Sequence, residues 1–145
     1  GLRPTVLDDF GLLKAVDKEA DRLRDAGIKV NWSTRCEARF PSQVEIALFR
    51  IAQEGINNIL KHAQASHVIL ALELHEGQAS LRVDDNGNGF TMEQRLDTCG
   101  ARHLGLAAMQ ERANLLGGDF TCVSHAHGGT QLRATVPSDL NGTAQ

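Results

Sequence analysis

The stretch Val83–Phe90, which reads Val-Asp-Asp-Asn-Gly-Asn-Gly-Phe, follows a segment in which apolar residues alternate with other residues. This alternating segment covers residues 68–83 and is interrupted once, at Glu76-Gly77. The pattern predicts a β-hairpin with one buried face. Val83–Phe90 therefore begins at the end of a strand, where polar and glycine residues can face a ligand.

Within this stretch, Asp85 and the glycines Gly87 and Gly89 are the candidate binding residues. A carboxylate at a strand end can accept a hydrogen bond from an exocyclic amine, as in the selection of adenine. Glycine allows a positive φ or a close backbone approach to a ligand. An ordinary Asp-Asn-Gly turn is the structural alternative.

Three other glycine-rich motifs do not fit the stretch. A dinucleotide fingerprint needs a third glycine where Met92 stands, and the Gly-Lys-Ser/Thr of a Walker A loop occurs nowhere in the chain. A calcium loop starting at Asp84 needs a glutamate at its twelfth position, which is Arg95.

Apolar periodicity outward from this stretch predicts an α+β sandwich. We expect one largely antiparallel sheet, covered by helices on one face and partly polar on the other. The predicted helices cover residues 12–26, 41–62 and 104–116, and the remaining predicted strands cover residues 28–34, 120–124 and 131–136. Residues 138–145 are expected to form a disordered tail.

The predicted helix 41–62 carries a second group of candidate residues: Glu54, Asn58, Lys61 and His62. Steps of four and three residues place them on one side of an α-helix. An amide oxygen is a hard ligand for Mg²⁺, and a lysine can neutralise phosphate oxygens. The group therefore suggests a magnesium–phosphate site, and the alternative is a solvated helix face.

Two further segments contain glycine next to polar residues. His103-Leu104-Gly105-Leu106 opens a predicted helix, where free backbone N–H groups can bind an anion. Gly128-Gly129-Thr130 forms the turn of the last hairpin, and its threonine could offer a hydroxyl. His75, at a strand end, and His125 and His127, in a hairpin, are interpreted as structural residues.

Composition limits the function classes. The chain has 145 residues, 41% hydrophobic and 23% charged, and its net charge of −3 gives no basic field for nucleic acid. It contains no apolar run of the ~18 residues that span a bilayer, and no signal peptide. The cysteines, Cys36, Cys99 and Cys122, are too scattered for a disulfide framework or a zinc site and indicate reduced thiols in a cytosolic protein. Because Gly1 stands in place of Met, we expect a piece of a longer protein.

Four segments together resemble the ATP-binding domain of two-component sensor histidine kinases, in the superfamily of DNA gyrase, MutL and the ninety-kilodalton chaperone. Phe49–Ala63 is similar to the N box, Val83–Phe90 to the first glycine box, His103–Ala113 to the second, and Gly128–Leu132 to the Gly-Thr element. The opening Leu2–Leu12 and the Lys-His-Ala end of the N box resemble nitrate-sensor and DegS-like kinases.

The resemblance implies a Bergerat-type fold that binds ATP with Mg²⁺. By position in the motifs, Asn58 would coordinate the metal, and Glu54 and Lys61 would take part in catalysis. Asp85 would bind the adenine amino group. The full implied ATP-binding set is Asn58, Lys61, His62, Asp85, Gly87, Gly89, Phe90, His103, Gly105, Leu106 and Thr130. His103 departs from the family's commonest motif, which has glycine at that position.

The resemblance also implies a division of labour within a longer kinase. Residues 12–137 would transfer the γ-phosphoryl group to a histidine on a separate dimerisation and phosphoacceptor domain, with residues 1–11 as the connector and Thr91–Arg102 as a mobile lid over ATP. The parent would be a homodimer that signals to a response regulator, with this part in the cytoplasm. The alternatives are an anti-sigma-factor serine kinase, a gyrase-like ATPase, or a nucleotide-sensing module without transfer activity.

Overall fold

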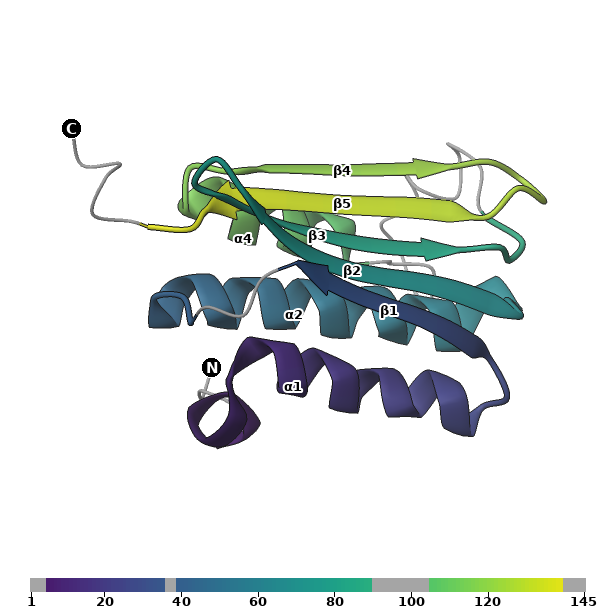
Figure 1. The fold of residues 1–145 in the computed structure, drawn as a ribbon. Helices are drawn as coiled ribbons and strands as arrows, with labels where there is room; N and C mark the ends of the chain where they lie inside the picture. The colour runs from purple at the N-terminus through teal and green to yellow at the C-terminus, as the bar shows by residue number, and fades with distance from the viewer. Residues whose placement is uncertain (1–4, 36–38, 90–104, 140–145) are drawn as a thin grey trace.

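The computed structural model describes residues 5–35, 39–89 and 105–139. Within these ranges, none of the helices combines the length and the apolar character that crossing a membrane requires. The chain forms, in order, α1 (Thr5–Asp25), β1 (Lys29–Arg35), α2 (Ser42–Asn58), a π-helical turn η1 (Ile59–Ala63), β2 (His67–His75), β3 (Gln78–Asp85), α4 (Leu106–Leu115), β4 (Asp119–Ser124) and β5 (Thr130–Pro137) (Figure 1).

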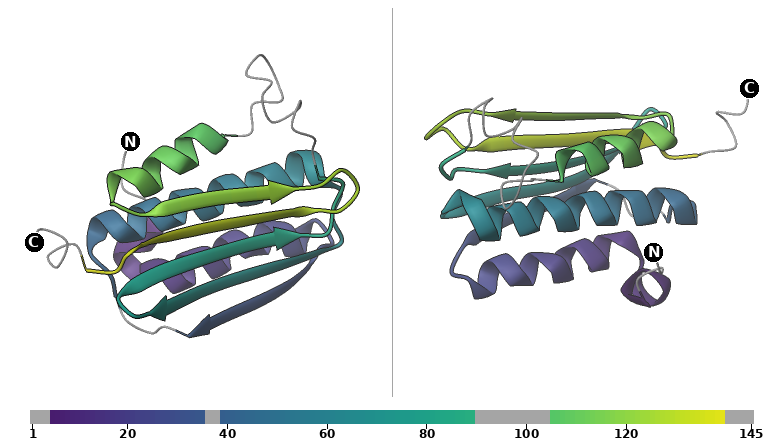
Figure 2. Two further views of the ribbon diagram at one scale, coloured as in Figure 1. Left: turned by 90° about the horizontal axis from the view of Figure 1, so that it is seen from above. Right: turned by 180° about the vertical axis from the view of Figure 1, so that it is seen from behind.

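The strands form a single mixed sheet in the order β1-β2-β3-β5-β4. Strand β1 runs parallel to β2, and the other neighbouring pairs are antiparallel. Helices α1, α2 and α4 all lie on one face of the sheet (Figures 1 and 2). This arrangement confirms the predicted α+β sandwich and its largely antiparallel sheet.

The core lies between the sheet and α2, the central helix of the layer. Leu48, Ile51 and Ile56 of α2 are completely buried. Each such side chain contributes about 1.5–3 kcal/mol relative to an exposed position. Gly55 of the same helix faces the sheet, because a Cβ there would lie 3.5 Å, an ordinary contact distance, from the side chains of Leu132 and Val83. Helix α2 is therefore held firmly against the strands that end at the candidate site.

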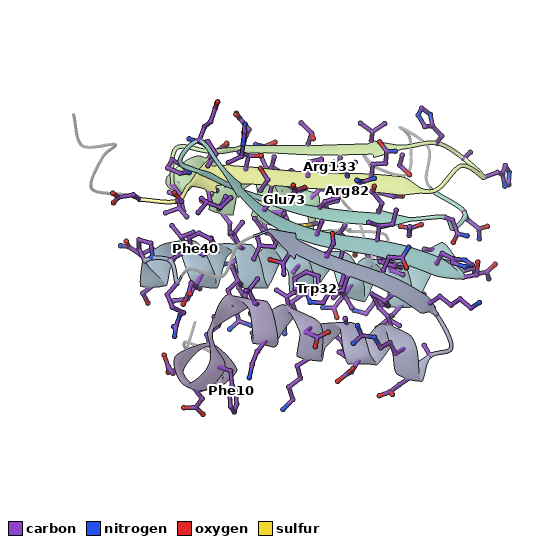
Figure 3. The ribbon with its side chains drawn as sticks, in the orientation of Figure 1. Phe10, Trp32, Phe40, Glu73, Arg82 and Arg133 are labelled. Atoms are coloured by element: carbon purple, nitrogen blue, oxygen red, sulfur yellow. The ribbon has the colours of Figure 1, made fainter. Side chains whose placement is uncertain are left out.

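The other face of the sheet is partly polar, as predicted, and contains a buried carboxylate. Asp84 is only 8% exposed. Arg82 Nε donates to its Oδ2 at 2.7 Å, and Arg133 donates through both terminal nitrogens. Arg82 and Arg133 are cross-strand partners on β3 and β5 and lie side by side in Figure 3. Two guanidinium groups thus compensate the charge of Asp84 on the open face.

Two helix boundaries differ from the prediction by four residues or more. Helix α1 starts at Thr5 instead of residue 12, because a helical turn precedes Gly11, whose backbone (φ 81°, ψ 176°) breaks the periodicity seen in the sequence. The second predicted helix is α-helical only to Asn58 and continues as the π-helical turn η1.

Ser138, where the predicted disordered tail begins, lies within the described residues and makes hydrogen bonds. Ser138 donates its backbone N–H and its hydroxyl to the carbonyl oxygen of Gly77, at 2.9 and 3.0 Å. The chain is therefore attached to the β2–β3 turn at residue 138, where the sequence predicted disorder. Residues 140–145 lie outside the described ranges.

Candidate functional site

Asp85 is the last residue of β3, on the helix-covered side of the sheet. Its Oδ1 accepts a hydrogen bond from the backbone N–H of Gly87 at 2.8 Å. Burial is the main cause that raises the pKa of Asp85 above its usual value, and the charge of Asp84 adds to the increase. Hydrogen bonds from the backbone of Gly87 and Thr130 act in the opposite direction. Asp85 is thus a half-buried acceptor with no cation among its perturbing groups.

The glycines of the candidate site are required by contacts of the chain with itself. A Cβ on Gly87 would lie 2.2 Å from the carbonyl oxygen of Ala63 in η1. A Cβ on Gly89 (φ 66°) would lie 2.0 Å from the carbonyl oxygen of His125. The sequence left open whether these glycines permit a positive φ or a close approach to a ligand. In the structure, both glycines lie close to backbone carbonyl groups from other segments of the same chain, Gly87 to that of Ala63 and Gly89 to that of His125.

Two asparagines that the sequence interpretation did not single out hold the segment after β3 in place. Asn86 Oδ1 accepts from the backbone N–H groups of Ser66 and His67, at 2.9 and 3.0 Å. Asn88 donates its backbone N–H to Ala63 O at 2.6 Å and its side-chain amide to Gln64 Oε1 at 3.1 Å. An asparagine directly after a strand signals such a turn, but its partners lie about twenty residues earlier in the chain.

The candidate residues of the second helix divide into two groups. Glu54 and Asn58 lie one helical turn apart in α2, and both are partly buried. Lys61 and His62 belong to η1 and are exposed. A π-helical turn has i→i+5 hydrogen bonds, so residues in it are rotated away from the α-helical series. Glu54 and Asn58 are thus both in α2, at the four-residue spacing expected of one face, whereas Lys61 and His62 belong to a turn of different helix type.

Glu54 lies against the start of α4. Gly105 precedes this helix with φ 70°, and a Cβ on it would lie 2.4 Å from Glu54 Oε1. Gly105 thus permits a carboxylate of α2 to approach the N-terminal end of α4, where negative charge is favourable. Leu106 is the first residue of α4 and is partly buried. The fold joins two segments that the sequence interpretation treated as separate motifs.

Thr130 begins β5 and is the register partner of Asp85. Its hydroxyl lies 2.7 Å from Ser124 Oγ, a hydrogen-bond partner that the sequence interpretation missed. Ser124 Oγ also donates to the carbonyl oxygen of Gly129 at 3.3 Å. The Thr130 hydroxyl is thus oriented by its neighbour on β4, beside the strand end that carries Asp85.

The remaining candidates are placed as follows. Phe90, His103 and the predicted lid Thr91–Arg102 lie outside the described residues. His75 ends β2 and is exposed, and the β4–β5 connection contains the exposed His125 and His127. Within the part of the chain that the structure describes, no three His, Cys, Asp or Glu side chains are grouped so that they could hold a metal ion.

Comparison with known proteins identifies the relatives of this chain. Residues 43–140 match the family model described as "Histidine kinase-, DNA gyrase B-, and HSP90-like ATPase". The chain is 35% identical over 138 residues to the signal transduction histidine-protein kinase/phosphatase DegS of Brevibacillus brevis, covering 94% of this chain and 35% of that protein. It is 37% identical over 138 residues to the oxygen sensor histidine kinase NreB of Staphylococcus carnosus, covering 94% of this chain and 39% of that protein. The chain thus spans little more than a third of the length of these relatives.

Solved structures support the fold. The blue-light activated histidine kinase of Erythrobacter litoralis EL346 superposes with a TM-score of 0.73 at 22% identity, over 91% of this chain and 43% of that chain. The catalytic domain of histidine kinase ThkA, in a nucleotide-free form, gives a TM-score of 0.71 at 12% identity, over 91% of this chain and 95% of that chain. On the family match and these relatives, the chain belongs to the histidine kinase-, DNA gyrase B- and HSP90-like ATPase family.

Proposed function

We propose that this domain binds Mg-ATP and donates the γ-phosphoryl group to a histidine on a separate dimerisation segment of a sensor kinase. Family membership supports nucleotide binding, and the curated relatives are named as sensor kinases. The observation that carries the proposal is Asp85, a half-buried carboxylate at the end of a central strand whose Oδ1 is held by Gly87 N–H. The parent protein would act as a homodimer and signal to a response regulator from the cytoplasm.

Asp85 would recognise the base. An ionised carboxylate only accepts hydrogen bonds, so it suits the exocyclic amine of adenine. Guanine carries a carbonyl oxygen at the corresponding position. Two hydrogen-bond acceptors, this oxygen and the carboxylate, would then face each other without a proton between them. The Thr130 hydroxyl, oriented by Ser124, lies on the neighbouring strand and would add a second polar contact. Asp85 would therefore provide specificity for adenine.

The end of α2 would hold the phosphates. Asn58 and Glu54 present hard oxygen atoms one turn apart in a partly buried position, which is the ligand chemistry that Mg²⁺ prefers. When bound, Mg²⁺ neutralises phosphate charge. Lys61 and His62 are exposed on η1 and could reach toward phosphate oxygens. The donor set of this chain therefore fits a magnesium–nucleotide complex.

The proposed reaction depends on positioning. An imidazole nitrogen of the acceptor histidine would form a bond to the γ-phosphorus as the bond to the β–γ bridging oxygen breaks, leaving ADP. Phosphoryl transfer of this type needs orientation and charge neutralisation more than a protein nucleophile. Glu54, next to Asn58 and the start of α4, would orient the acceptor imidazole or accept its proton.

Incubation with γ-labelled ATP tests the proposal. The chain alone should bind ATP without becoming labelled, and a dimerisation segment of the parent kinase added in trans should acquire acid-labile, base-stable label. Label on this chain alone would contradict the proposed division of roles. Label on a serine of a partner would indicate an anti-sigma-factor kinase. Phosphate release without label would indicate a gyrase-like ATPase, and binding without either reaction a nucleotide sensor.

A further inference from the structure

Gly11 divides α1 into two parts. Its backbone angles, φ 81° and ψ 176°, lie in a region that is essentially restricted to glycine. The helical turn before it, Thr5–Phe10, therefore leaves the axis of the rest of α1. This turn lies at the same end of the molecule as the start of α2 (Figure 1). A side chain at position 11 would force a different direction on the turn.

A charged pair fastens this turn to the start of α2. Glu45 is 1% exposed, and its oxygens accept from Arg39 Nε at 2.9 Å and from an Arg39 terminal nitrogen at 3.0 Å. The same terminal nitrogen of Arg39 donates to Leu7 O at 3.4 Å. Leu7 itself is completely buried. We call Arg39, Glu45, Leu7 and Gly11 the N-terminal clamp.

The position of the Arg39 side chain depends on the absence of a side chain at Gly11. A Cβ on Gly11 would lie 3.1 Å from both Cδ and Nε of Arg39, which is tighter than ordinary contact. Glu45 also accepts from the backbone N–H of Phe40 at 3.3 Å, but Arg39 provides its two-pronged guanidinium contact. Loss of such a partner leaves a buried carboxylate uncompensated, which strongly lowers the stability of the fold. The Arg39 side chain is 58% exposed and that of Glu45 is 1% exposed, so the clamp joins a guanidinium group at the surface to a buried carboxylate.

We propose that Arg39 and Glu45 are positioning residues for phosphoryl transfer, because they fix the direction of Thr5–Phe10 relative to α2. This inference rests on the proposed function. Glu45 and Asn58 lie near opposite ends of α2, about 20 Å apart along the helix. Figure 3 labels Phe40, beside the start of α2, and Phe10, on the turn. The clamp therefore sets where the connector leaves the domain without contacting the nucleotide site.

Hydrogen exchange of this chain tests the clamp. The double variant Arg39→Met, Glu45→Gln removes both charges and keeps similar bulk, and Gly11→Ala disturbs the turn and crowds Arg39 but keeps both charges. Both should increase amide exchange of Thr5–Phe10 by about tenfold. ADP affinity should stay within about twofold of the unmodified chain. In the full-length kinase, kcat for autophosphorylation should fall by about tenfold with KM for ATP unchanged.

Gly27→Ala is the matched control for Gly11→Ala. Gly27 also has a positive φ, 85°, but a Cβ there meets nothing within 4 Å, so backbone strain is introduced away from the clamp. Unchanged exchange of Thr5–Phe10 in both clamp variants would overturn the proposal. So would an equal increase throughout residues 12–25, or an unchanged kcat despite faster exchange. If the unmodified chain did not bind ADP, the proposed function would fail, while the exchange measurement would still decide whether the clamp exists.

Discussion

Asp84 and Asp85 are neighbours with opposite environments. Successive residues of a strand point to opposite faces of the sheet, so Asp84 lies on the open face and Asp85 on the helix-covered face. Asp84 is compensated by Arg82 and Arg133. Asp85 receives backbone N–H groups, and burial raises its pKa. The two carboxylates should therefore respond differently to the same substitution.

Asp85→Asn should separate nucleotide binding from stability. The amide oxygen can still accept from Gly87 N–H, but the charged acceptor for adenine is lost. We expect ADP binding to weaken by about 1.5–3 kcal/mol or more, as measured by calorimetry in EDTA. The free energy of unfolding in urea should be unchanged or higher, because a half-buried charge has been removed.

Asp84→Asn is the matched control. It leaves two guanidinium groups against a neutral amide, so it should lower the free energy of unfolding by about 1–3 kcal/mol while ADP still binds. Normal ADP binding by Asp85→Asn, or loss of binding by Asp84→Asn in folded protein, would mean that the recognition role is assigned to the wrong carboxylate.

The pH dependence of stability should show the raised pKa of Asp85. Between pH 3.8, the ordinary pKa, and its raised pKa, the Asp85 carboxyl group binds more proton in the folded protein than in the unfolded chain. The contribution of Asp85 to stability therefore decreases as the pH rises through its folded pKa. The difference in unfolding free energy between Asp85→Asn and the unmodified chain should be largest at neutral pH and diminish on acidification. A difference that does not vary with pH would contradict the shift.

At the scale of elements, the contact between η1 and the segment after β3 should be sensitive to one methyl group. Gly87→Ala would place a Cβ 2.2 Å from Ala63 O, so either segment must move. We expect a loss of about 1–3 kcal/mol in unfolding free energy. ADP affinity should also fall, because the Gly87 N–H that holds Asp85 would shift.

Gly55→Ala is the control for this substitution. Its Cβ would lie 3.5 Å from Leu132 and Val83, an ordinary contact, and alanine favours the helix over glycine by up to about 1 kcal/mol. This variant should be close to neutral or slightly stabilising. Equal stability of both variants in urea would show that η1 and the segment after β3 do not pack as tightly as the structure shows.

At the scale of the whole molecule, the core extends beyond the domain boundary predicted at residue 12. Leu7 is 0% exposed, while Phe10 of the same helical turn is 58% exposed. Leu7→Ala should therefore lower the free energy of unfolding by about 2–4 kcal/mol. Phe10→Ala should change it by less than about 0.5 kcal/mol. Similar denaturation midpoints for the two variants would show that this turn is not part of the folded core.

The secondary structure and the fold class were predictable because they depend on local patterns. Alternation in residues 68–83 reflects one buried and one solvated face, and the structure confirms it as β2 and β3. The order of helices and strands in the described ranges was also correct, and the partly polar second face of the sheet follows from the same alternation. Asp85 could be placed at a strand end for this reason.

The sequence by itself determined the elements and the types of residue at the candidate site, whereas the tertiary structure alone decided their partners. Ser66 is twenty residues from Asn86, Leu7 thirty-two from Arg39, and Asp84 forty-nine from Arg133. Such contacts leave no periodic signal, because they depend on how the chain closes and not on which residues face water. The π-helical turn that contains Lys61 and His62 is likewise invisible to a 3.6-residue pattern, since the backbone geometry changes while the sequence spacing does not.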